Sequence, residues 1–414
     1  MKQRYQYRAY LSVAQQEYAA QIFGCARVVF NDFVAERQRL FEAGLHKSVG
    51  FGETEKKVIT HAKLTAERAW LADVPNVVLQ QSVRDAQQAY RNFFDSAAKV
   101  RKGKRVNPPK FKKRNGSQRA RFSRDRIRVK PTTHGVGFVK PSNMGWIRFV
   151  MHRPLPSEPS SVTLIKEADG TWYVSFVVDV PDAKPSDPTG RVAGLDAGVG
   201  DDLLAITYSD GTREKVSNPR HYRNAQKRLA KAQRDLSRKE KGSKRREKAK
   251  LRVAKAHSKV KRTRLDAHHK LAARLVAEND VIAIEDLALN GLARTRLAKS
   301  VHDAGIGNLY RLIHEKAESQ GRLMVKAGLW EPTSQTCSVC GTPGGKKPLN
   351  IRAWTCGGCG MVLDRDWNAA TNIMIAAGLA ETLNARGGNI RRTLASAGDA
   401  VPVETRTHRT SSDA

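Results

Sequence analysis

Two kinds of apolar periodicity alternate along the chain. Residues 2–10 alternate polar with aromatic or apolar side chains, which predicts a strand. From Ala14 the apolar positions recur every three or four residues, and the same period returns in "VPNVVLQQSVRDAQQAYRNFF" after a looser, Gly-containing stretch. Residues 11 to about 100 are therefore predicted to form a helical unit that follows a first strand.

A basic segment, "KVRKGKRVNPPKFKKRNGSQRARFSRDRIRVK", ends the helical pattern at Pro108 and Pro109. Its cations surround Phe111 and Phe122. Two interpretations stay open at this point. The segment can lie along a phosphate backbone with its rings stacked on bases, or it can be a solvated linker with two anchoring aromatic residues.

Short strands follow the basic segment. "GVGFV", "GWIRFV" and "SVTLIKEADGTWYVSFVVDV" have strand patterns, and Asp169-Gly170 supplies a hairpin turn in the last of them. We expect a small β unit that closes near Val180. The Pro-rich, polar stretch "PDAKPSDPTG" then predicts a linker.

The second half of the chain alternates strands and helices. "RVAGLDAGVG" and "LLAITYSDG" are predicted strands, "DVIAIEDL" is a buried strand that ends in acidic residues, and "GNLYRLIHEKAESQG" is a helix before the strand "RLMVKAG". Residues 220–264 hold 20 Lys or Arg against three Asp or Glu, yet keep a narrow apolar stripe, which predicts two basic helices joined at Gly242-Ser243. This alternation indicates an α/β sheet.

The charge of the chain narrows the class of partner. Lys and Arg number 74 against 40 Asp and Glu, a formal net charge of +34. A nucleic acid is the expected partner, because a membrane-surface protein would need aromatic residues opposite the basic stretches. We find no run of about 18 apolar residues and no apolar stretch of secretory type near residue 1, so a cytoplasmic location is expected, with nucleoid association when bound.

Four of the five cysteines form two pairs. Cys337-x-x-Cys340 and Cys356-x-x-Cys359 are fifteen residues apart, which is within the spacing of a four-cysteine zinc ribbon. Four thiolates leave no open position on the metal, so the zinc is expected to be structural. A thioredoxin-like redox site is the alternative, but it uses a single pair. Cys25 stands alone on a predicted apolar helix face.

Three acidic residues stand where strands end or helices begin: Asp196, Glu285 and Asp366. Converging carboxylates can hold two divalent ions about 4 Å apart, which is the arrangement that hydrolyses phosphodiesters, and oxygen ligands suit Mg²⁺ or Mn²⁺. Each acid alone can equally be a surface charge or a helix cap, and Asp366 in particular can cap a helix starting at Asn368. Asp286 and Asp364 compete for the same roles from opposite faces.

The order "GLDAGVG", "IAIEDL", two CxxC pairs and "DRDWNAATNI" resembles the TnpB (OrfB) family of bacterial insertion sequences, relatives of the type V CRISPR effectors. The front end agrees, since "FGCARVVFNDFVAERQRLFEAG" resembles the family's helix-turn-helix region and "PPKFKKR" a segment after it. The likeness covers roughly residues 1–380. Two positions depart from the family pattern: "GVGDDLL" is acidic where Lys or Asn is expected, and Ile306 replaces a usual Trp.

The resemblance implies a multidomain fold, an RNase H-like (RuvC) α/β nuclease domain with an inserted zinc ribbon behind an N-terminal β-barrel (wedge) that holds a helical recognition lobe. The implied divisions are 1–10 for the first wedge strand, 11–105 for the recognition lobe, 106–182 for the rest of the wedge, 183–190 for the linker, 191–332 for the RuvC domain with basic helices 220–264, 333–363 for the ribbon, 364–382 for the RuvC end, and 383–414 for a disordered tail.

The resemblance also implies an activity, RNA-guided cleavage of DNA by a two-metal RuvC site. Asp196, Glu285 and Asp366 match its three acids and would hold Mg²⁺. The implied partners are a guide RNA from the transposon end and a double-stranded DNA target with a short flanking motif. Such proteins are often labelled transposases. The alternative is a nucleic-acid-binding protein without cleavage, such as an RNA-guided repressor or an accessory transposase.

Cations in the two basic regions are the candidate nucleic-acid contacts, because their charge is almost all of one sign. They are Lys110, Lys112, Lys113, Arg114, Arg228, Lys231, Arg238, Lys244, Arg245 and Arg246.

Overall fold

The computed structural model describes residues 2–45, 48–101, 103–114, 116, 118–131, 135–181, 186–328, 332–348 and 350–379. The predicted tail 383–414 lies outside these residues. The chain divides into two compact units, Met1–Asp182 with Lys227–Lys259, and Ala183–Gln226 with Val260–Ala414. In the described residues, no helix is both long and apolar enough to cross a membrane.

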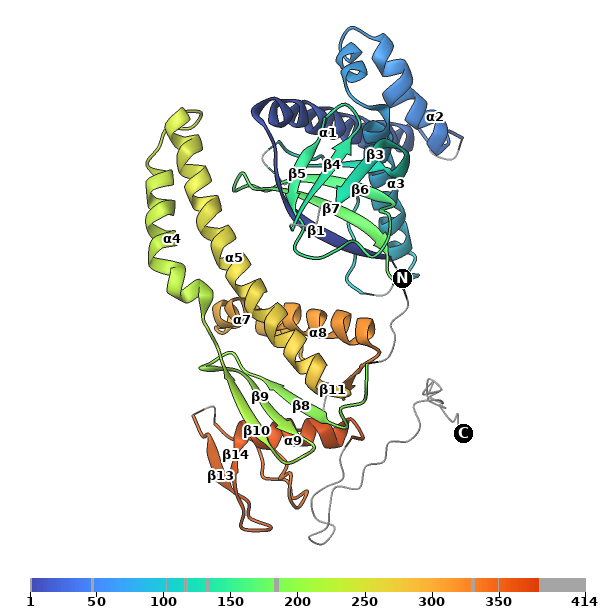
Figure 1. The fold of residues 1–414 in the computed structure, drawn as a ribbon. Coiled ribbons are helices and arrows are strands. Elements are labelled where there is room, and N and C mark those ends of the chain that lie inside the picture. The colour runs from blue at the N-terminus through green and yellow to red at the C-terminus, as the bar shows by residue number, and fades with distance from the viewer. Residues whose placement is uncertain are drawn as a thin grey trace, which may run out of the picture. The chain divides into compact units, whose positions relative to one another are not determined.

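The first unit is built on a seven-stranded antiparallel sheet in the order β2-β6-β7-β1-β5-β4-β3 (Figure 1). One face of this sheet carries the core, in which the ring of Tyr7 contacts those of Phe149 and Phe176. The predicted first strand and the hairpin around Asp169-Gly170 are confirmed. The strands are β1 (Lys2–Tyr10), β2 (Gln118–Ser123), β3 (Ile127–Pro131), β4 (Val136–Pro141), β5 (Ile147–Val150), β6 (Ser161–Lys166) and β7 (Trp172–Asp179).

Helices of the first unit follow the predicted apolar period. Helix α1 (Val13–Glu42) starts directly after β1, where Ser12 and Gln15 form a capping box. Its buried stripe packs with α3 (Asn76–Ala97). Between these helices lie α2 (Phe51–Lys56), a π-helical turn (Lys57–His61) and 3₁₀ turns at Ala62–Leu64 and Ala69–Asp73; another 3₁₀ turn, Arg124–Arg126, joins β2 to β3.

The structure corrects the interpretation of the basic segment. From Gln118 it is not a solvated linker, because it forms strands β2 and β3. Phe122 is fully buried in the core of the sheet, so its ring cannot stack on a base. The alternation "RARFS" carries the strand signal, but its outward positions are arginines, which made the segment resemble a solvated chain.

The second unit contains a five-stranded mixed sheet in the order β10-β9-β8-β11-β12 (Figure 1). Strands β8, β11 and β12 run parallel, and β9 and β10 run antiparallel to their neighbours. The predicted strands are confirmed; β10 was not predicted. The strands are β8 (Val192–Ala197), β9 (Asp202–Tyr208), β10 (Arg213–Ser217), β11 (Val281–Glu285) and β12 (Leu323–Ala327).

Helices cover both faces of this sheet. On one face, Leu195 and Ile284 pack in a core with Leu275 of α5 (Lys244–Glu278) and Ile313 of α8 (Ile306–Gln320). On the other face, α9 (Arg365–Ala376) packs against Ala283. Ile306, at the position where the family has Trp, lies in the first of these cores. The shorter helices are α6 (Leu289–Leu292) and α7 (Ala298–Ala304).

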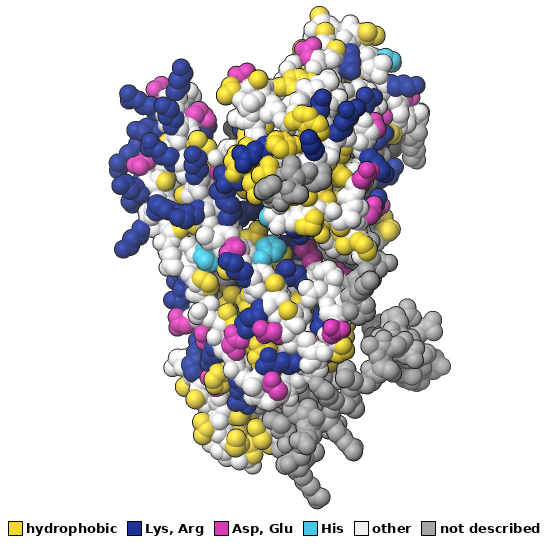
Figure 2. Space-filling model, viewed as in Figure 1, with side chains coloured by type: hydrophobic (Ala, Val, Ile, Leu, Met, Phe, Trp, Pro, Cys, Tyr) yellow, Lys and Arg dark blue, Asp and Glu magenta, His cyan; other side chains and the backbone are white. Residues whose placement is uncertain are grey.

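The two predicted basic helices are α4 (His221–Ser237) and the first part of α5. Gly242, whose φ is 90°, turns the chain between them, as predicted. Arg246 donates hydrogen bonds to the carbonyl oxygens of Leu236 and Lys239 at 3.0 and 2.6 Å, which stabilises the end of α4. Figure 2 shows Lys and Arg side chains gathered densely over this hairpin.

The contact between β8 and α9 predicts a sensitive position at Gly194. A Cβ atom there would lie 2.2 Å from the carbonyl oxygen of Ala370, so the helix has to move away from the strand. We expect Gly194→Ala to lower the free energy of unfolding by about 1–3 kcal/mol, as overpacking does, measured by calorimetric thermal unfolding.

Gly24→Ala is the matched control, because nothing lies within 4 Å of a Cβ atom at this mid-helix position of α1. It should leave the protein as stable or add about 0.5–1 kcal/mol. Equal melting temperatures for the two variants would show that α9 does not need the close approach.

Candidate functional site

Two of the predicted acids lie side by side at the ends of parallel strands. In the register of β8 and β11, Leu195 is opposite Ile284, so Asp196 and Glu285 are the next residues of each strand. Both acids share a face of the sheet with Gly194 and Ala283, because side chains alternate along a strand. This is the face that α9 covers.

The third acid arrives on α9. The absence of a side chain at Gly194 lets the backbone of α9 approach β8. Asp366 lies in the first turn of this helix and lines the same cleft as Asp196 and Glu285, a hollow of about 560 Å³. Three residues that are 81 or more positions apart in sequence are thus brought together by strand order and one helix contact.

Negative charge is crowded in this cleft. Burial first, and then the charges of Glu285 and Asp366, raise the pKa of Asp196 to about 7. Arg365 and Arg352 oppose this rise only in part. Burial also raises the pKa of Glu285. A carboxylate pair with raised pKa values is stabilised by a cation in the same cleft.

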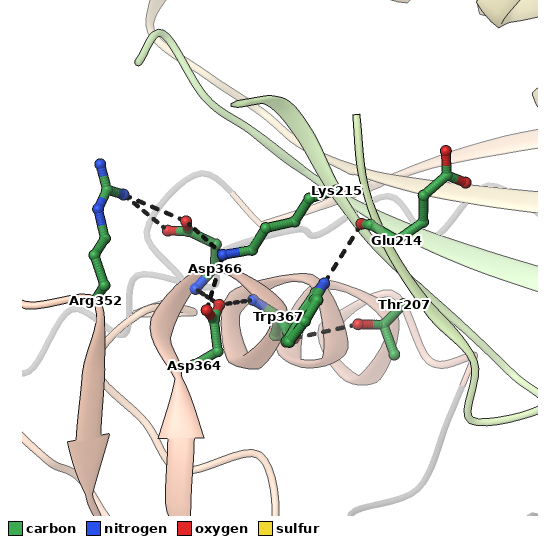
Figure 3. A network of polar contacts seen from close by, with 7 residues as sticks. All are labelled: Thr207, Glu214, Lys215, Arg352, Asp364, Asp366 and Trp367. Carbon is green, nitrogen blue, oxygen red and sulfur yellow. Dashed lines mark hydrogen bonds and ion pairs between the residues drawn. The ribbon is translucent and has the colours of Figure 1, made fainter. Parts of the chain in front are cut away.

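Two basic side chains meet at Asp366 (Figure 3). Lys215 of β10 places its Nζ 2.8 Å from a carboxylate oxygen of Asp364 and 3.6 Å from one of Asp366. Arg352 approaches Asp366 from the cysteine-rich segment at 3.3 Å. Neither cation was predicted from the sequence, because their proximity depends on the position of β10 and on the path of the chain between the cysteine pairs.

Asp364 and Asp366 have different roles at the start of α9. Asp364, not Asp366, caps α9: its carboxylate accepts hydrogen bonds from the backbone N–H groups of Asp366 and Trp367 at 3.0 and 3.1 Å. The helix therefore starts at Arg365, and the idea that Asp366 caps a helix beginning at Asn368 is wrong. Partial burial raises the pKa of Asp364, but hydrogen bonds from Lys215 and the two amides outweigh this and hold it low.

Asp286 forms an ion pair with Lys326 at 3.2 Å and is not among the residues that line the cleft. Of the pair that "IAIEDL" offers, Glu285 is therefore the cleft residue. Asp201 and Asp202, the acidic departure from the family pattern, also line the cleft, where Asp201 pairs with Arg220.

The four paired cysteines form one cluster. Their Sγ atoms all lie within 4.8 Å of one another, with 3.4 Å between Cys340 and Cys356 and 3.8 Å between Cys337 and Cys359. Zinc–sulfur bonds of about 2.3 Å in a tetrahedron require sulfur separations close to these values. The donor set fits a structural zinc ion in a ribbon.

Both cysteine pairs are built in the same way. The N–H groups of Gly341 and Gly360 donate to the carbonyl oxygens of Cys337 and Cys356, each at 2.9 Å. Both glycines have φ above 70°, a conformation that most residues avoid. The second turn lies between strands β13 (Ala353–Thr355) and β14 (Val362–Asp364), and β14 leads directly into α9.

Asparagines of "DRDWNAATNI" connect α9 to the first cysteine turn. Asn368 accepts a hydrogen bond from the N–H of Ser338 at 2.8 Å and donates to the carbonyl oxygen of Thr336 at 2.8 Å. Asn372, one turn later, donates to the same oxygen and to that of Thr333, both at 2.7 Å. The cysteine cluster is therefore linked by hydrogen bonds to the helix that carries Asp366.

The predicted nucleic-acid cations are distributed over several surfaces. Lys112 places its Nζ 3.7 Å from the centre of the Phe30 ring. Together with Lys113 it lines another cleft, which lies in the first unit. Arg228 and Lys231 line a groove between α4 and α5. Contacts of the full set with nucleic acid stay a prediction.

Three protein-family descriptions match the chain. "Probable transposase" of the OrfB/IS605 type matches residues 175–296, "Cas12f1-like, TNB domain" matches residues 307–373, and "Helix-turn-helix domain" of the same OrfB type matches residues 1–46. The second match contains the cysteine cluster and the start of α9.

Two bacterial relatives are similar over almost the whole chain. A "Putative RNA-guided DNA endonuclease" of Streptomyces pristinaespiralis is 38% identical over 396 residues, which cover 94% of this chain and 92% of the relative. A protein of Escherichia coli K12 with the same description, InsQ, is 30% identical over 380 residues, or 87% of this chain and 89% of the relative.

Solved structures share the fold at low identity. A Cas12f1–sgRNA–target DNA complex superimposes with a TM-score of 0.52 at 14% identity and covers 90% of this chain and 98% of that one. The mini-RNA-guided endonuclease CRISPR-Cas_phi3 gives 0.51 at 11% identity, with coverage of 91% and 92%. The chain therefore has the multidomain fold of these effectors.

The cysteine geometry predicts the metal content. Cys356→Ser should remove most of the bound zinc, because three thiolates leave the tetrahedral shell incomplete. The measurement is zinc per chain by plasma mass spectrometry. Cys25→Ser is the control, since Cys25 lies buried on α1 in the first unit and should retain full zinc. Equal zinc in both variants would contradict the assignment.

The asparagine contacts predict that Asn368→Ala loosens the ribbon. It leaves the buried N–H of Ser338 without its acceptor, which costs about 1–3 kcal/mol. We expect faster zinc release to a chromogenic chelator. Thr371→Val is the control, because the Thr371 hydroxyl donates within α9 only, to the carbonyl oxygen of Trp367. Unchanged release from Asn368→Ala would disprove the coupling.

Proposed function

The chain belongs to the TnpB (OrfB) family, and from this membership and the geometry of the carboxylate cleft we propose that it is an RNA-guided DNA endonuclease of an insertion sequence. Relatives at 38% and 30% identity carry that description. The observation that carries the proposal is the convergence of Asp196, Glu285 and Asp366 in one cleft.

The second unit serves as an RNase H-like (RuvC) nuclease domain in this proposal. Three parallel strands with an antiparallel pair at one edge, and acids at the ends of β8 and β11, support it. The ribbon, residues 333–363, is inserted between β12 and α9. The seven-stranded sheet takes the role of the wedge and the helices within residues 11–105 that of the recognition lobe, while the basic helices 220–264 are assigned to the RuvC domain, as in the divisions given above.

The donor set of the cleft fits magnesium. Three carboxylates offer the hard oxygen ligands that Mg²⁺ prefers. Burial raises the pKa of Asp196 and of Glu285, and the charges of Glu285 and Asp366 raise that of Asp196 further, so a divalent ion in the cleft would favour the ionised forms. Asp196, Glu285 and Asp366 would hold two such ions. When bound, they supply a water-derived nucleophile and stabilise the leaving oxygen of a phosphodiester.

The residues of the chain itself place the DNA backbone in the cleft. Arg352, whose side chain is 61% exposed, and Lys215 stand at the rim beside Asp366. Both cations attract a phosphate to the rim of the cleft. Burial of Asp196 lowers the local dielectric, so every charge interaction with the phosphate is stronger than in water.

The guide RNA and the DNA target are the proposed partners. Helix α4 and the start of α5 carry charges that are almost all positive, which supports contacts with phosphate backbones (Figure 2). In effectors of this kind, base pairing with the guide reads the sequence while the protein reads shape and a short flanking motif.

Cleavage should depend on Glu285 and not on its neighbour. We expect Glu285→Gln to slow cutting of a matching plasmid by about a thousandfold or more, because several kcal/mol of charge stabilisation is lost. Asp286→Asn is the matched control, since Asp286 pairs with Lys326 and is not among the cleft residues. The assay uses copurified RNA, with Mg²⁺ against EDTA.

Cutting that survives in Glu285→Gln, or in EDTA, would refute the assigned site. RNA-dependent binding of the target without cutting in the wild type would instead favour a nuclease-silent RNA-guided repressor.

A further inference from the structure

The outward face of the seven-stranded sheet carries an unusual row of side chains. In the strand registers, Lys130 of β3 is opposite Phe138 of β4, Phe138 is opposite Arg148 of β5, and Arg148 is opposite Tyr10 of β1. Cation and aromatic ring thus alternate across four adjacent strands. We call these four residues the outer row.

The outer row is on the side of the sheet away from its core. The residues that follow or precede it along the strands, Ala9, Val139 and Phe149, are buried, so the row itself points outward. Tyr10 is 47% exposed, Lys130 and Arg148 are exposed, and Phe138 is half-buried.

Two guanidinium groups lie near the ring of Tyr10. Arg8, two residues earlier on β1, places its Cζ 5.5 Å from the ring centre, and Arg148 places its Cζ 5.8 Å away. Because Tyr10 is still 47% exposed, its ring keeps accessible surface for a base beside cations that can contact a phosphate. Trp146, which precedes β5 and is 45% exposed, adds a further aromatic side chain two residues from Arg148.

On strands β2, β6 and β7, helices cover this same face of the sheet. Arg119 of β2, Ile165 of β6 and Ser175 of β7 line a cleft together with Phe23 of α1 and Gln81 of α3. Helices therefore stand over that half of the face, while the outer row lies on the other half.

The chemistry of the outer row matches an unpaired nucleotide chain. Aromatic rings stack on bases without sequence preference, and cations between them neutralise phosphates. Tyr10 and Phe138 are two strands apart, about 10 Å at the usual strand spacing of about 4.8 Å, so a phosphodiester link can pass over Arg148. Open sheet faces with stacking aromatic residues are a recurring way to bind single-stranded RNA.

We propose that the outer row binds an unpaired stretch of RNA, with bases on Tyr10 and Phe138 and phosphate on Arg148. This inference rests on the proposed function, which supplies a bound RNA. RNA is favoured over single-stranded DNA because, under that function, the target strand pairs with the guide and the displaced strand has to reach the carboxylates of the second unit.

The test is photocrosslinking on the full chain after copurified RNA has been removed at high salt. The probe is a short uridine oligonucleotide that carries 4-thiouridine, and its partner probe is the same length of thymidine DNA with 4-thiothymidine. Peptide mass spectrometry locates the attached residues. We expect RNA crosslinks on β1, β4 or β5. Crosslinks there from DNA alone, or from neither probe, would overturn the proposal.

Affinity measurements separate stacking from charge. Tyr10→Ala and Phe138→Ala should each weaken binding of the uridine probe about five- to a hundredfold with an unchanged salt dependence. Arg148→Gln should reduce the slope of log affinity against log salt by about 0.7, the value for one phosphate on a single strand.

Trp70→Ala is the matched control. Trp70 is also an exposed aromatic residue of the first unit with an arginine over its ring, Arg68 at 6.0 Å, but it does not belong to the sheet. It should bind the probe like the wild type. Equal losses from Trp70→Ala and Tyr10→Ala would show that the probe stacks on any exposed aromatic residue of the first unit, which would refute the outer row.

The result is separable from that of the nuclease test. Glu285→Gln should crosslink at the outer row like the wild type. If the wild type cleaves DNA but Tyr10→Ala and Phe138→Ala bind the probe normally, the outer-row proposal is refuted and the proposed function is not. If the probe crosslinks at the outer row but the wild type does not cleave DNA, the proposed function is refuted and the outer-row proposal is not.

Discussion

The approach of α9 to β8 is the contact on which the candidate site depends. Glycine at position 194 removes the one side chain that would separate the helix backbone from the strand. The gain is that Asp366 reaches the same cleft as Asp196 and Glu285. The cost is that burial first, and then the charges of Glu285 and Asp366, raise the pKa of Asp196 to about 7.

The cysteine cluster stabilises the position of α9 and therefore of Asp366. The four cysteines have the donor set of a structural zinc site, and such an ion would close two turns that are otherwise short loops and contribute folding free energy directly. Asn368 and Asn372 then fasten α9 to the first turn, while β14 carries the chain from the second turn to the cap at Asp364. Because the ribbon comes immediately before Asp366 in the sequence, the cysteine cluster supports the position of Asp366. The ribbon also places Arg352 at the rim of the carboxylate cleft.

Local patterns in the sequence predicted much of this, and non-local contacts account for what they missed. The cysteine spacing and the acids at strand ends are local signals, and the helices followed their apolar period. Phe122 was misjudged because arginines occupy the outward positions of its strand. Lys215 and Arg352 could not be found, since nothing near them in sequence indicates that β10 and the ribbon meet at Asp366. The outer row likewise exists only through the register of four strands.

We propose that the cleft of Asp196, Glu285 and Asp366 holds divalent cations. A chain with a net charge of +34 repels free cations, so ions that it retains report a built site. The direct measurement is an electron paramagnetic resonance titration of zinc-loaded protein with Mn²⁺, wild type beside Asp196→Asn. We predict two bound Mn²⁺ ions per chain in the wild type and a clear loss in the variant. No bound Mn²⁺ in the wild type, or the same number in both proteins, would contradict the account.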